Sequence, residues 1–363
     1  MEKRTSPTSW AVVLLIVLVC VGIAAIGSYL ITHAGRTSAG TCTPTNVRVD
    51  SDVRILGEGI VYYDGAMIGA LDKNGVVKWN YSAGINAEYN VGPGGIATWT
   101  TSSLSFINKY TGDTLYSSVT TMPVLSAVVG PQYAAVMLGS ESAAQMRIYE
   151  LTGREIDQID LSGKTVLDYG FFSNGALLWV MALDTSGSVP MSTITTYQPG
   201  KSTLGSVTEI EEVLYRTQFQ DSRLKAIGTT HIKTYDYTGT EIQSERKLIY
   251  GWYVQAVEEN VADPLMALVP VAQAEALAEI RDVKLVRGNT ERVVRMPFPC
   301  DAVFCQDDTL YGFADSAVMI CPPGSTIVSA YQLPIHIDRV IGVTDSKIAV
   351  IESGSVVYYV TLP

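Results

Sequence analysis

The pattern of apolar and polar positions divides the chain into an apolar N-terminal segment and a long region of short strands. Between Trp10 and Thr32 no side chain is charged. As a helix, these 23 residues would span about 34 Å, which exceeds the roughly 30 Å of a bilayer's hydrocarbon core. Because only a helix satisfies its own backbone hydrogen bonds in lipid, the pattern predicts one transmembrane helix over residues 10–32.

The flanks of residues 10–32 predict the orientation of the chain. Residues 1–9 form a short polar tail with Lys3 and Arg4, which favours a cytoplasmic N-terminus and places the bulk of the chain outside the membrane. Residues 33–45 are rich in Gly, Ser and Thr and predict a short stalk. A cleaved signal peptide, with Thr37-Ser38-Ala39 as its cleavage site, is the alternative. Its apolar region usually runs only about 7–15 residues, so the length favours an uncleaved anchor.

From residue 46 onward the pattern changes to short β-rich runs. The runs 60–63, 67–71 and 76–79 consist mostly of β-branched, aromatic and small apolar residues. Turn residues separate them, namely Asp64-Gly65 and Lys73-Asn74-Gly75. Such runs broken by such turns are typical of antiparallel hairpins. We therefore expect an all-β domain over residues 46–363.

The hairpin around Gly75 returns along the chain at intervals of about forty residues, the length of a four-stranded propeller blade. Each copy places a polar residue and a glycine between two strands. Glycine is favoured there because a tight hairpin turn requires a positive φ angle, and a preceding Asp, Glu or Asn caps the turn with its side chain. The turn glycines are Gly75, Gly112, Gly153, Gly200, Gly239, Gly288 and Gly324.

The end of the chain completes the blade count. Three strands are expected at 339–343, 347–351 and 356–361, and an N-terminal strand at 46–50 can supply the fourth and hide the final edge. Seven internal hairpins and this split blade predict a β-propeller of eight four-stranded blades. Seven blades are the alternative, because the turn at Gly288 is poorly marked. Residues 272–280 fit either a strand or an Ala-rich helical turn.

Two copies carry further marks of a known repeat. Ala70, Asp72, Gly75 and Trp79 stand one residue short of its spacing, and Asn108, Thr111, Gly112 and Tyr116 keep the full spacing. The region thus resembles the quinoprotein-type (PQQ-like repeat) β-propellers, in which these residues join blades and the aromatic side chain packs between sheets. Enzymatic members bind a quinone and calcium and often carry adjacent cysteines, which this chain lacks. The likeness is closer to non-enzymatic propellers tethered outside bacterial membranes, including families of unknown function, and implies no cofactor.

Composition and charge exclude some partners. Charged residues make up 17% and hydrophobic ones 47%, so the chain can bury a large core. The net charge is −11, and the residues after Arg4 carry −12. Because a nucleic-acid surface needs a concentrated basic face, nucleic acid is not expected as a partner.

The sequence shows no catalytic, cofactor-binding or metal-binding motif. Within the predicted propeller, residues 46–363, only His231 and His336 occur, and we interpret both as structural. The pairs Glu211-Glu212 and Glu258-Glu259 are the best carboxylates for a glycosidase-like site, but read more simply as solvated charges. Gly92-Pro93-Gly94-Gly95 is not followed by Lys-Ser and predicts a loop.

The cysteines leave two alternatives open. In an oxidising exterior, Cys42, Cys300, Cys305 and Cys321 allow three complete disulfide pairings. A bridge from Cys42 to the last full blade would lock the ring. Buried free thiols are the other interpretation.

These features predict a membrane-anchored, extracytoplasmic β-propeller that serves as a protein-interaction scaffold in the bacterial cell envelope. Its partners would be the bilayer, through residues 10–32, and an envelope protein or a cell-wall component. Residues 82–91, 139–144 and 184–191 are the candidate contact loops. The alternatives are a ligand- or glycan-binding sensor ectodomain and a carboxylate-based glycan-active enzyme.

Overall fold

The computed structural model describes residues 37–38, 40–140, 143–172, 175–184, 187–188, 191–210, 212–220, 223–258, 261, 263–272 and 279–363. The expected tail (1–9), the expected transmembrane helix (10–32) and residues 33–36 and 39 of the expected stalk lie outside these residues. Within the described ranges, no helix has both the length and the apolar character needed to cross a membrane.

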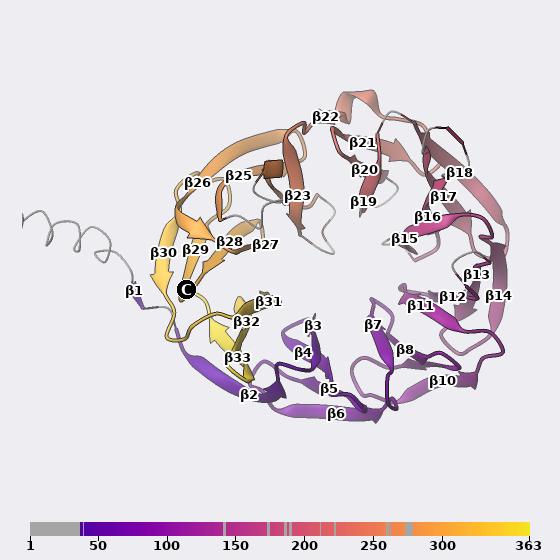
Figure 1. Cartoon of the computed structure of the whole chain (residues 1–363), viewed down its shortest axis with the longest axis horizontal. Coiled ribbons are helices and arrows are strands. Elements are labelled where there is room, and N and C mark those ends of the chain that lie inside the picture. Colours follow the sequence, from indigo (N-terminus) through magenta and orange to yellow (C-terminus); the bar gives the residue numbers. More distant parts are fainter. Residues whose placement is uncertain are drawn as a thin grey trace, which may run out of the picture.

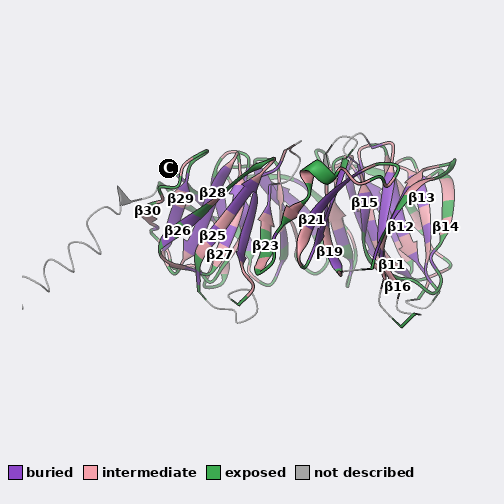
Figure 2. Cartoon of the chain, turned by 90° about the horizontal axis from the view of Figure 1, so that it is seen from above, coloured by how far each residue is buried: buried purple, intermediate pink, exposed green. Residues whose placement is uncertain are grey.

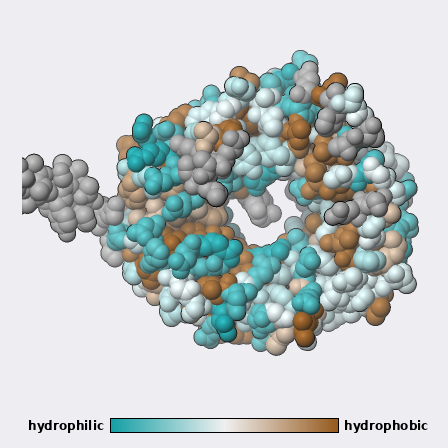
Figure 3. Space-filling model, in the orientation of Figure 1, coloured by the Kyte–Doolittle hydropathy of each residue, from teal (hydrophilic) through white to brown (hydrophobic). Residues whose placement is uncertain are grey.

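The described part of the chain forms eight sheets arranged as a ring around an open central channel (Figures 1 and 3). Each sheet is one blade of four strands that follow one another from the channel to the rim, and one sheet carries a short fifth strand at its rim. The prediction of an all-β propeller with eight blades, and not seven, is confirmed.

The first four blades use consecutive strands. Blade 1 consists of β3 (Asp52–Leu56), β4 (Gly59–Tyr63), β5 (Met67–Leu71) and β6 (Val77–Ser82), and blade 2 of β7 (Glu88–Val91), β8 (Ile96–Thr100), β9 (Ser103–Ile107) and β10 (Thr114–Val119). Blade 3 consists of β11 (Val124–Val129), β12 (Tyr133–Leu138), β13 (Gln145–Glu150) and β14 (Glu155–Asp160), and blade 4 of β15 (Thr165–Phe171), β16 (Leu178–Asp184), β17 (Met191–Gln198) and β18 (Ser202–Glu209).

The remaining blades follow in the same way, except that the last one is split. Blade 5 consists of β19 (Leu214–Gln220), β20 (Arg223–Gly228), β21 (His231–Asp236) and β22 (Lys247–Leu248), with the 3-10 helix η1 (Gln243–Glu245) before β22. Blade 6 consists of β23 (Trp252–Val257), β24 (Met266–Pro270), β25 (Ile280–Arg287) and β26 (Thr290–Cys300), and blade 7 of β27 (Ala302–Gln306), β28 (Thr309–Ala314), β29 (Ala317–Cys321) and β30 (Ser329–Gln332). Blade 8 consists of β31 (Arg339–Val343), β32 (Ile348–Ser353), β33 (Val356–Thr361) and β2 (Cys42–Arg48).

An N-terminal strand and the C-terminal strand meet in blade 8, as the sequence predicted. Strand β2 pairs antiparallel with β33, and Cys42 lies opposite Val360. The strand begins at Cys42, so residues 42–45, expected in the stalk, belong to the last blade. The short strand β1 (Thr37–Ser38) pairs in parallel with β30 at the rim of blade 7 (Figure 1). For residues 272–280, strand β25 begins at Ile280, while 273–278 lie outside the described ranges.

All seven predicted turn glycines lie between the third and fourth strands of blades 1–7, with φ angles between +50° and +92°. This left-handed region suits glycine because a Cβ atom would be strained there. The polar residue before the glycine caps the turn as expected. Asp72 Oδ1 accepts hydrogen bonds from the backbone N–H groups of Asn74 (2.8 Å) and Val76 (2.9 Å). The bond from Val76 contributes most to lowering the pKa of Asp72.

Eight apolar clusters, one between each pair of neighbouring blades, form the core of the described residues. Because each blade packs against a neighbour on both faces, its middle strands are buried almost throughout. Strand β8 is an example, with Ile96 to Trp99 buried in succession. Fourth strands such as β10 stay partly exposed at the rim, and exposed residues gather at the turns of both ring faces (Figure 2).

The ring has two faces, which we name by their connections. The connector face carries the links between successive blades and the turns between second and third strands. The hairpin face carries the glycine turns and the links between first and second strands. Because every blade is antiparallel with its strands in the same order, the position of a loop in the strand order determines the face on which it lies.

Candidate functional site

The three predicted contact loops all lie on the connector face. Residues 82–91 link blades 1 and 2, whereas 139–144 and 184–191 join second and third strands of blades 3 and 4. Parts of the latter two, 141–142, 185–186 and 189–190, lie outside the described residues. The first loop is tied down by Tyr63, whose hydroxyl donates to Gly84 O (2.7 Å) and accepts from Ala87 N (3.1 Å).

Residues 88–91 of that loop are strand β7, and Glu88, Tyr89 and Asn90 line a hollow of about 300 Å³ in the channel wall. The hollow spans the first strands of blades 1–4 and carries Arg54, Glu88 and Asp168. The Arg54 guanidinium lies 4.6 Å above the centre of the Tyr89 ring. Desolvation by the surrounding protein atoms raises the pKa of Asp168, although this residue is exposed.

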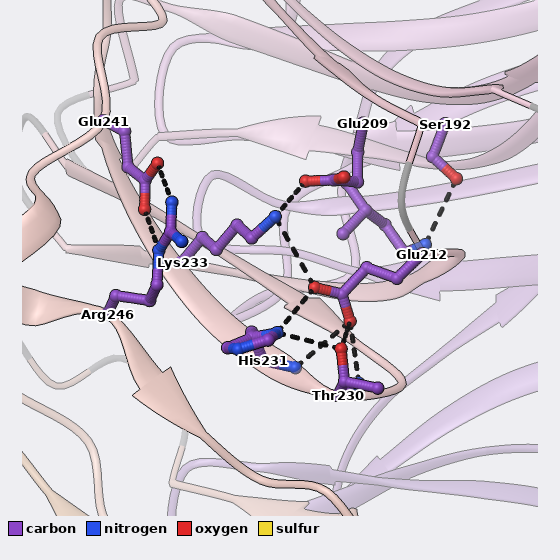
Figure 4. A network of polar contacts seen from close by, with 9 residues as sticks. Ser192, Glu209, Glu212, Thr230, His231, Lys233, Glu241 and Arg246 are labelled. Atoms are coloured by element: carbon purple, nitrogen blue, oxygen red, sulfur yellow. Dashed lines mark hydrogen bonds and ion pairs between the residues drawn. The ribbon is translucent and has the colours of Figure 1, made fainter.

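A buried ion network on the connector face joins blades 4 and 5 (Figure 4). The Lys233 ammonium lies 2.5 Å from Glu209 Oε2 and 3.6 Å from Glu212 Oε1, and all three side chains are nearly inaccessible. Burial alone would raise the pKa of Glu212. Hydrogen bonds from Thr230 and His231 and the charge of Lys233 instead lower it below its ordinary value.

The prediction that Glu212 and Glu258 are solvated charges is wrong. Glu212 accepts hydrogen bonds from the backbone N–H groups of Thr230 and His231, and buried Glu258 accepts them from Leu265 and Asp308. Hydrogen bonds from backbone N–H groups to these carboxylates offset the cost of burying them. The two side chains belong to opposite faces of the ring and do not converge. Glu211 and Glu259 lie outside the described residues.

The contacts of His231 lack the geometry of a nucleophilic relay. In a Ser-His-Asp relay, the hydroxyl and the carboxylate contact opposite ring nitrogens of the histidine. Here Thr230 Oγ1 (2.9 Å) and Glu212 Oε1 (3.3 Å) both lie against Nδ1, and Thr230 donates its hydroxyl to Glu212. His336, on the loop between blades 7 and 8, contacts Asp315 at 2.7 Å in solvent.

Five large apolar side chains are exposed on the connector face around this network. We call this set, which comprises Ile210, Val213, Leu248, Tyr250 and Tyr253, the blade 5 patch. Direct contacts join its segments: Glu212 binds the 230–231 turn, His231 lies opposite Leu248, and the Tyr253 ring stacks on Tyr215 at 5.0 Å. The patch residues therefore lie on segments of the connector face that contact one another.

The four described cysteines are free thiols. Cys300, Cys305 and Cys321 are buried, and burial raises the pKa of Cys300 to about 12. Of the two interpretations left open by the sequence, the structure therefore has unpaired thiols and no bridge from Cys42. Among the residues that the structure describes, no group of three or more His, Cys, Asp or Glu side chains can hold a metal ion.

Sequence reasoning missed the buried lysines. Lys225 and Lys233 stand in the middle of strands, each with an apolar residue before it, and this break in an apolar run was the available signal. Nothing in the sequence shows which blade such a side chain faces, because its partners come from loops 20 to 40 positions away.

Solved structures with the same fold come from different functional classes. BamB from Moraxella catarrhalis is 11% identical with a TM-score of 0.53, covering 89% of this chain and 99% of that one. The C-terminal WD40 domain of Sif2 is 13% identical with a TM-score of 0.59, covering 91% and 99%. The tricorn protease is 11% identical with a TM-score of 0.53, covering 79% of this chain and 34% of that one. No protein-family model and no curated protein matches the sequence. These similarities show the propeller fold alone.

Proposed function

We propose that this protein is a membrane-anchored, extracytoplasmic scaffold whose connector face binds another protein of the bacterial cell envelope. The blade 5 patch is the observation that carries this proposal. Aromatic side chains are enriched in the centres of protein interfaces, and Tyr is among the residues that contribute most binding energy. An exposed group of five apolar side chains, two of them Tyr, is the kind of surface that a partner covers.

The charge of the chain defines the partner further. Everything after Arg4 carries a net charge of −12, so a partner with an apolar contact surface and a basic rim is favoured. The proposed location rests on the uncharged run 10–32 and on Lys3 and Arg4 before it. The proposed contact loops 82–91, 139–144 and 184–191 would widen the interface on the same face.

Crosslinking in intact membranes followed by affinity purification tests the scaffold. We expect the wild-type chain to capture a specific envelope protein and the double variant Ile210→Asp/Tyr250→Ala to lose it. The matched control is Tyr110→Ala/Ile327→Asp on the hairpin face. These side chains are similarly exposed, at 66% and 75% against 60% and 75% for Ile210 and Tyr250. Unchanged melting temperatures in both variants would show that folding is intact.

Three results would contradict the proposal. Equal loss of the partner in both double variants would remove the connector face from the interaction. Recovery of no specific partner, together with hydrolysis of a cell-wall polymer, would favour a glycan-active enzyme acting at channel carboxylates such as Glu88 and Asp168. Protection of the propeller from protease added outside intact spheroplasts would contradict the proposed location.

A further inference from the structure

A cleft of about 210 Å³ lies between blades 5 and 6, and it is separate from the blade 5 patch. Strand alternation explains its blade 5 wall. Arg223 and Lys225 are two positions apart on β20 and share one face, and Lys225 lies opposite Thr234 on β21. Ile232, on the same face of β21, lies opposite Lys247 of β22. This wall therefore presents three cationic side chains and one hydroxyl group to blade 6.

Lys225 is buried with an incomplete set of partners. Its residue is only 7% exposed, and its ammonium lies 3.7 Å from Asp263 Oδ1, too far for a hydrogen bond. The same Asp263 oxygen already accepts a hydrogen bond from Gly288 N (3.0 Å). An ammonium group has three protons to donate, and burying it without acceptors is costly. The cleft thus holds a cation that lacks hydrogen-bond acceptors among the described protein atoms.

Thr234 adds a second incomplete group beside the first. The residue is 1% exposed, and its Oγ1 has no hydrogen-bond partner among the residues that the structure describes. Buried hydroxyl groups almost always have a partner, so each exception points to a bound water or ion. Because Thr234 lies opposite Lys225 in the β20–β21 ladder, both side chains lie on the same face of blade 5 and line the same cleft.

The charges of the lining select the sign of the ligand. Arg223, Lys225 and Lys247 face Glu245 and Asp263, which leaves one net positive charge in a chain of net charge −11. Arg223 pairs with Glu245, so that pair neutralises itself. The volume far exceeds what a single water requires. An anion with several acceptor oxygens fits both incomplete groups.

We propose that this cleft binds a phosphoryl group, as inorganic phosphate or as a small phosphate ester. Lys225 and Thr234 donate hydrogen bonds to its oxygens, and Lys247 adds positive charge at the rim. Lysine binds phosphate as a point charge, and a hydroxyl group supplies a directed donor. The site is independent of the proposed scaffold surface, because it lies between blades 5 and 6 and shares no residue with the blade 5 patch.

Isothermal titration calorimetry of the full-length protein in detergent tests this site, with inorganic phosphate titrated at constant ionic strength. We expect saturable binding by the wild type and at least tenfold weaker binding by Lys225→Met. Thr234→Val should weaken binding severalfold while the ligand-free melting temperature stays equal or rises, because an unpaired buried hydroxyl group is removed. Lys164→Met, which removes an exposed lysine before β15, is the matched charge control and should bind like the wild type.

Titration with glycerol phosphate distinguishes the two sources of the phosphoryl group. Tighter binding than inorganic phosphate supports an ester as ligand, whereas equal or weaker binding supports free phosphate. No saturable binding of either compound by the wild type overturns the proposal. If Lys225→Met fails to fold, a folded Thr234→Val protein with wild-type affinity for phosphate overturns it equally.

Discussion

One position of the repeat holds an aromatic side chain at the junction between blades 1 and 2. The same position holds an acidic side chain at the junction between blades 3 and 4. Four residues after the turn glycine of blade 1, Trp79 packs beneath the next blade's turn, where a Cβ on Gly112 would lie 2.8 Å from its ring. Its indole N–H donates to Lys109 O (3.1 Å). At the same position of blade 3, Asp157 Oδ2 accepts from Gly200 N (2.9 Å).

Two other junctions show the same position in use. Tyr116 of blade 2 packs under Gly153, where an added Cβ would overlap its ring, and Arg292 of blade 6 donates to Ser325 O (2.9 Å) in the turn of blade 7. A glycine turn offers both a bare surface for an aromatic ring and free backbone groups for a polar side chain. The geometry of the junction is therefore shared, while the residue that occupies it varies.

The junction of blades 4 and 5 departs furthest from the aromatic pattern. On the connector face it buries Lys233 with Glu209 and Glu212, whereas the junction of blades 1 and 2 buries Trp79 and Tyr89. Burying charges is costly unless they are paired, so this junction depends on complete pairing, and the first depends on packed volume.

The largest effect is expected for Trp79→Ala. Removing a buried indole leaves a cavity and should lower the free energy of unfolding by about 4 kcal/mol. Urea unfolding of the full-length protein, followed by circular dichroism, measures the change. Trp79→Phe should restore much of the loss by refilling the space under Gly112. Capture of a protein partner should persist in any folded variant, and its loss at an unchanged melting temperature would place Trp79 in a binding site.

A slightly smaller loss is expected for Lys233→Met. The variant keeps the volume but leaves two buried carboxylates without their shared cation, which should cost about 3 kcal/mol. The same urea titration provides the measurement. Lys73→Met, which breaks a solvent-exposed pair with Glu58, is the control and should leave stability nearly unchanged. Equal effects in the two variants would show that burial does not govern the strength of the blade 4–5 junction.

The smallest effect is expected for Asp157→Ala. One partly exposed hydrogen bond to Gly200 is lost, with an expected cost of about 0.5–1 kcal/mol. Asp157→Asn keeps an acceptor oxygen and should recover most of the stability. A loss as large as that of Trp79→Ala would mean that polar and aromatic junctions contribute equally, and the comparison would fail.

Much of the fold was predictable because its signals are local. A turn that requires a positive φ angle favours glycine, and short β-rich runs on either side of it predict strands. Gly75 and the six other turn glycines therefore indicated the number of internal hairpins. The last strands, 339–343 and 356–361, agree with β31 and β33. The prediction that Trp79 joins blades is confirmed, because its ring packs under Gly112 of blade 2 and its indole N–H donates to Lys109 O.

The candidate sites were less predictable because their groups meet only through packing. The blade 5 patch combines residues 210–213 with 248–253, and the phosphoryl cleft combines β20 and β21 with Asp263 of the next blade. Glu212 and Glu258 were expected in solvent, since an acidic pair near a strand end usually lies there. The structure shows backbone N–H groups from distant loops around both.

The sequence by itself determined the period of the repeat, the positions of its turns and the closure of the ring by an N-terminal strand. These depend on backbone sterics and on alternation within single hairpins. Only the tertiary structure decided which side chains are buried as ions and which cysteines stay unpaired. Those outcomes depend on how each blade packs on the next. The sequence of a strand does not show which residues of the neighbouring blade its side chains will contact.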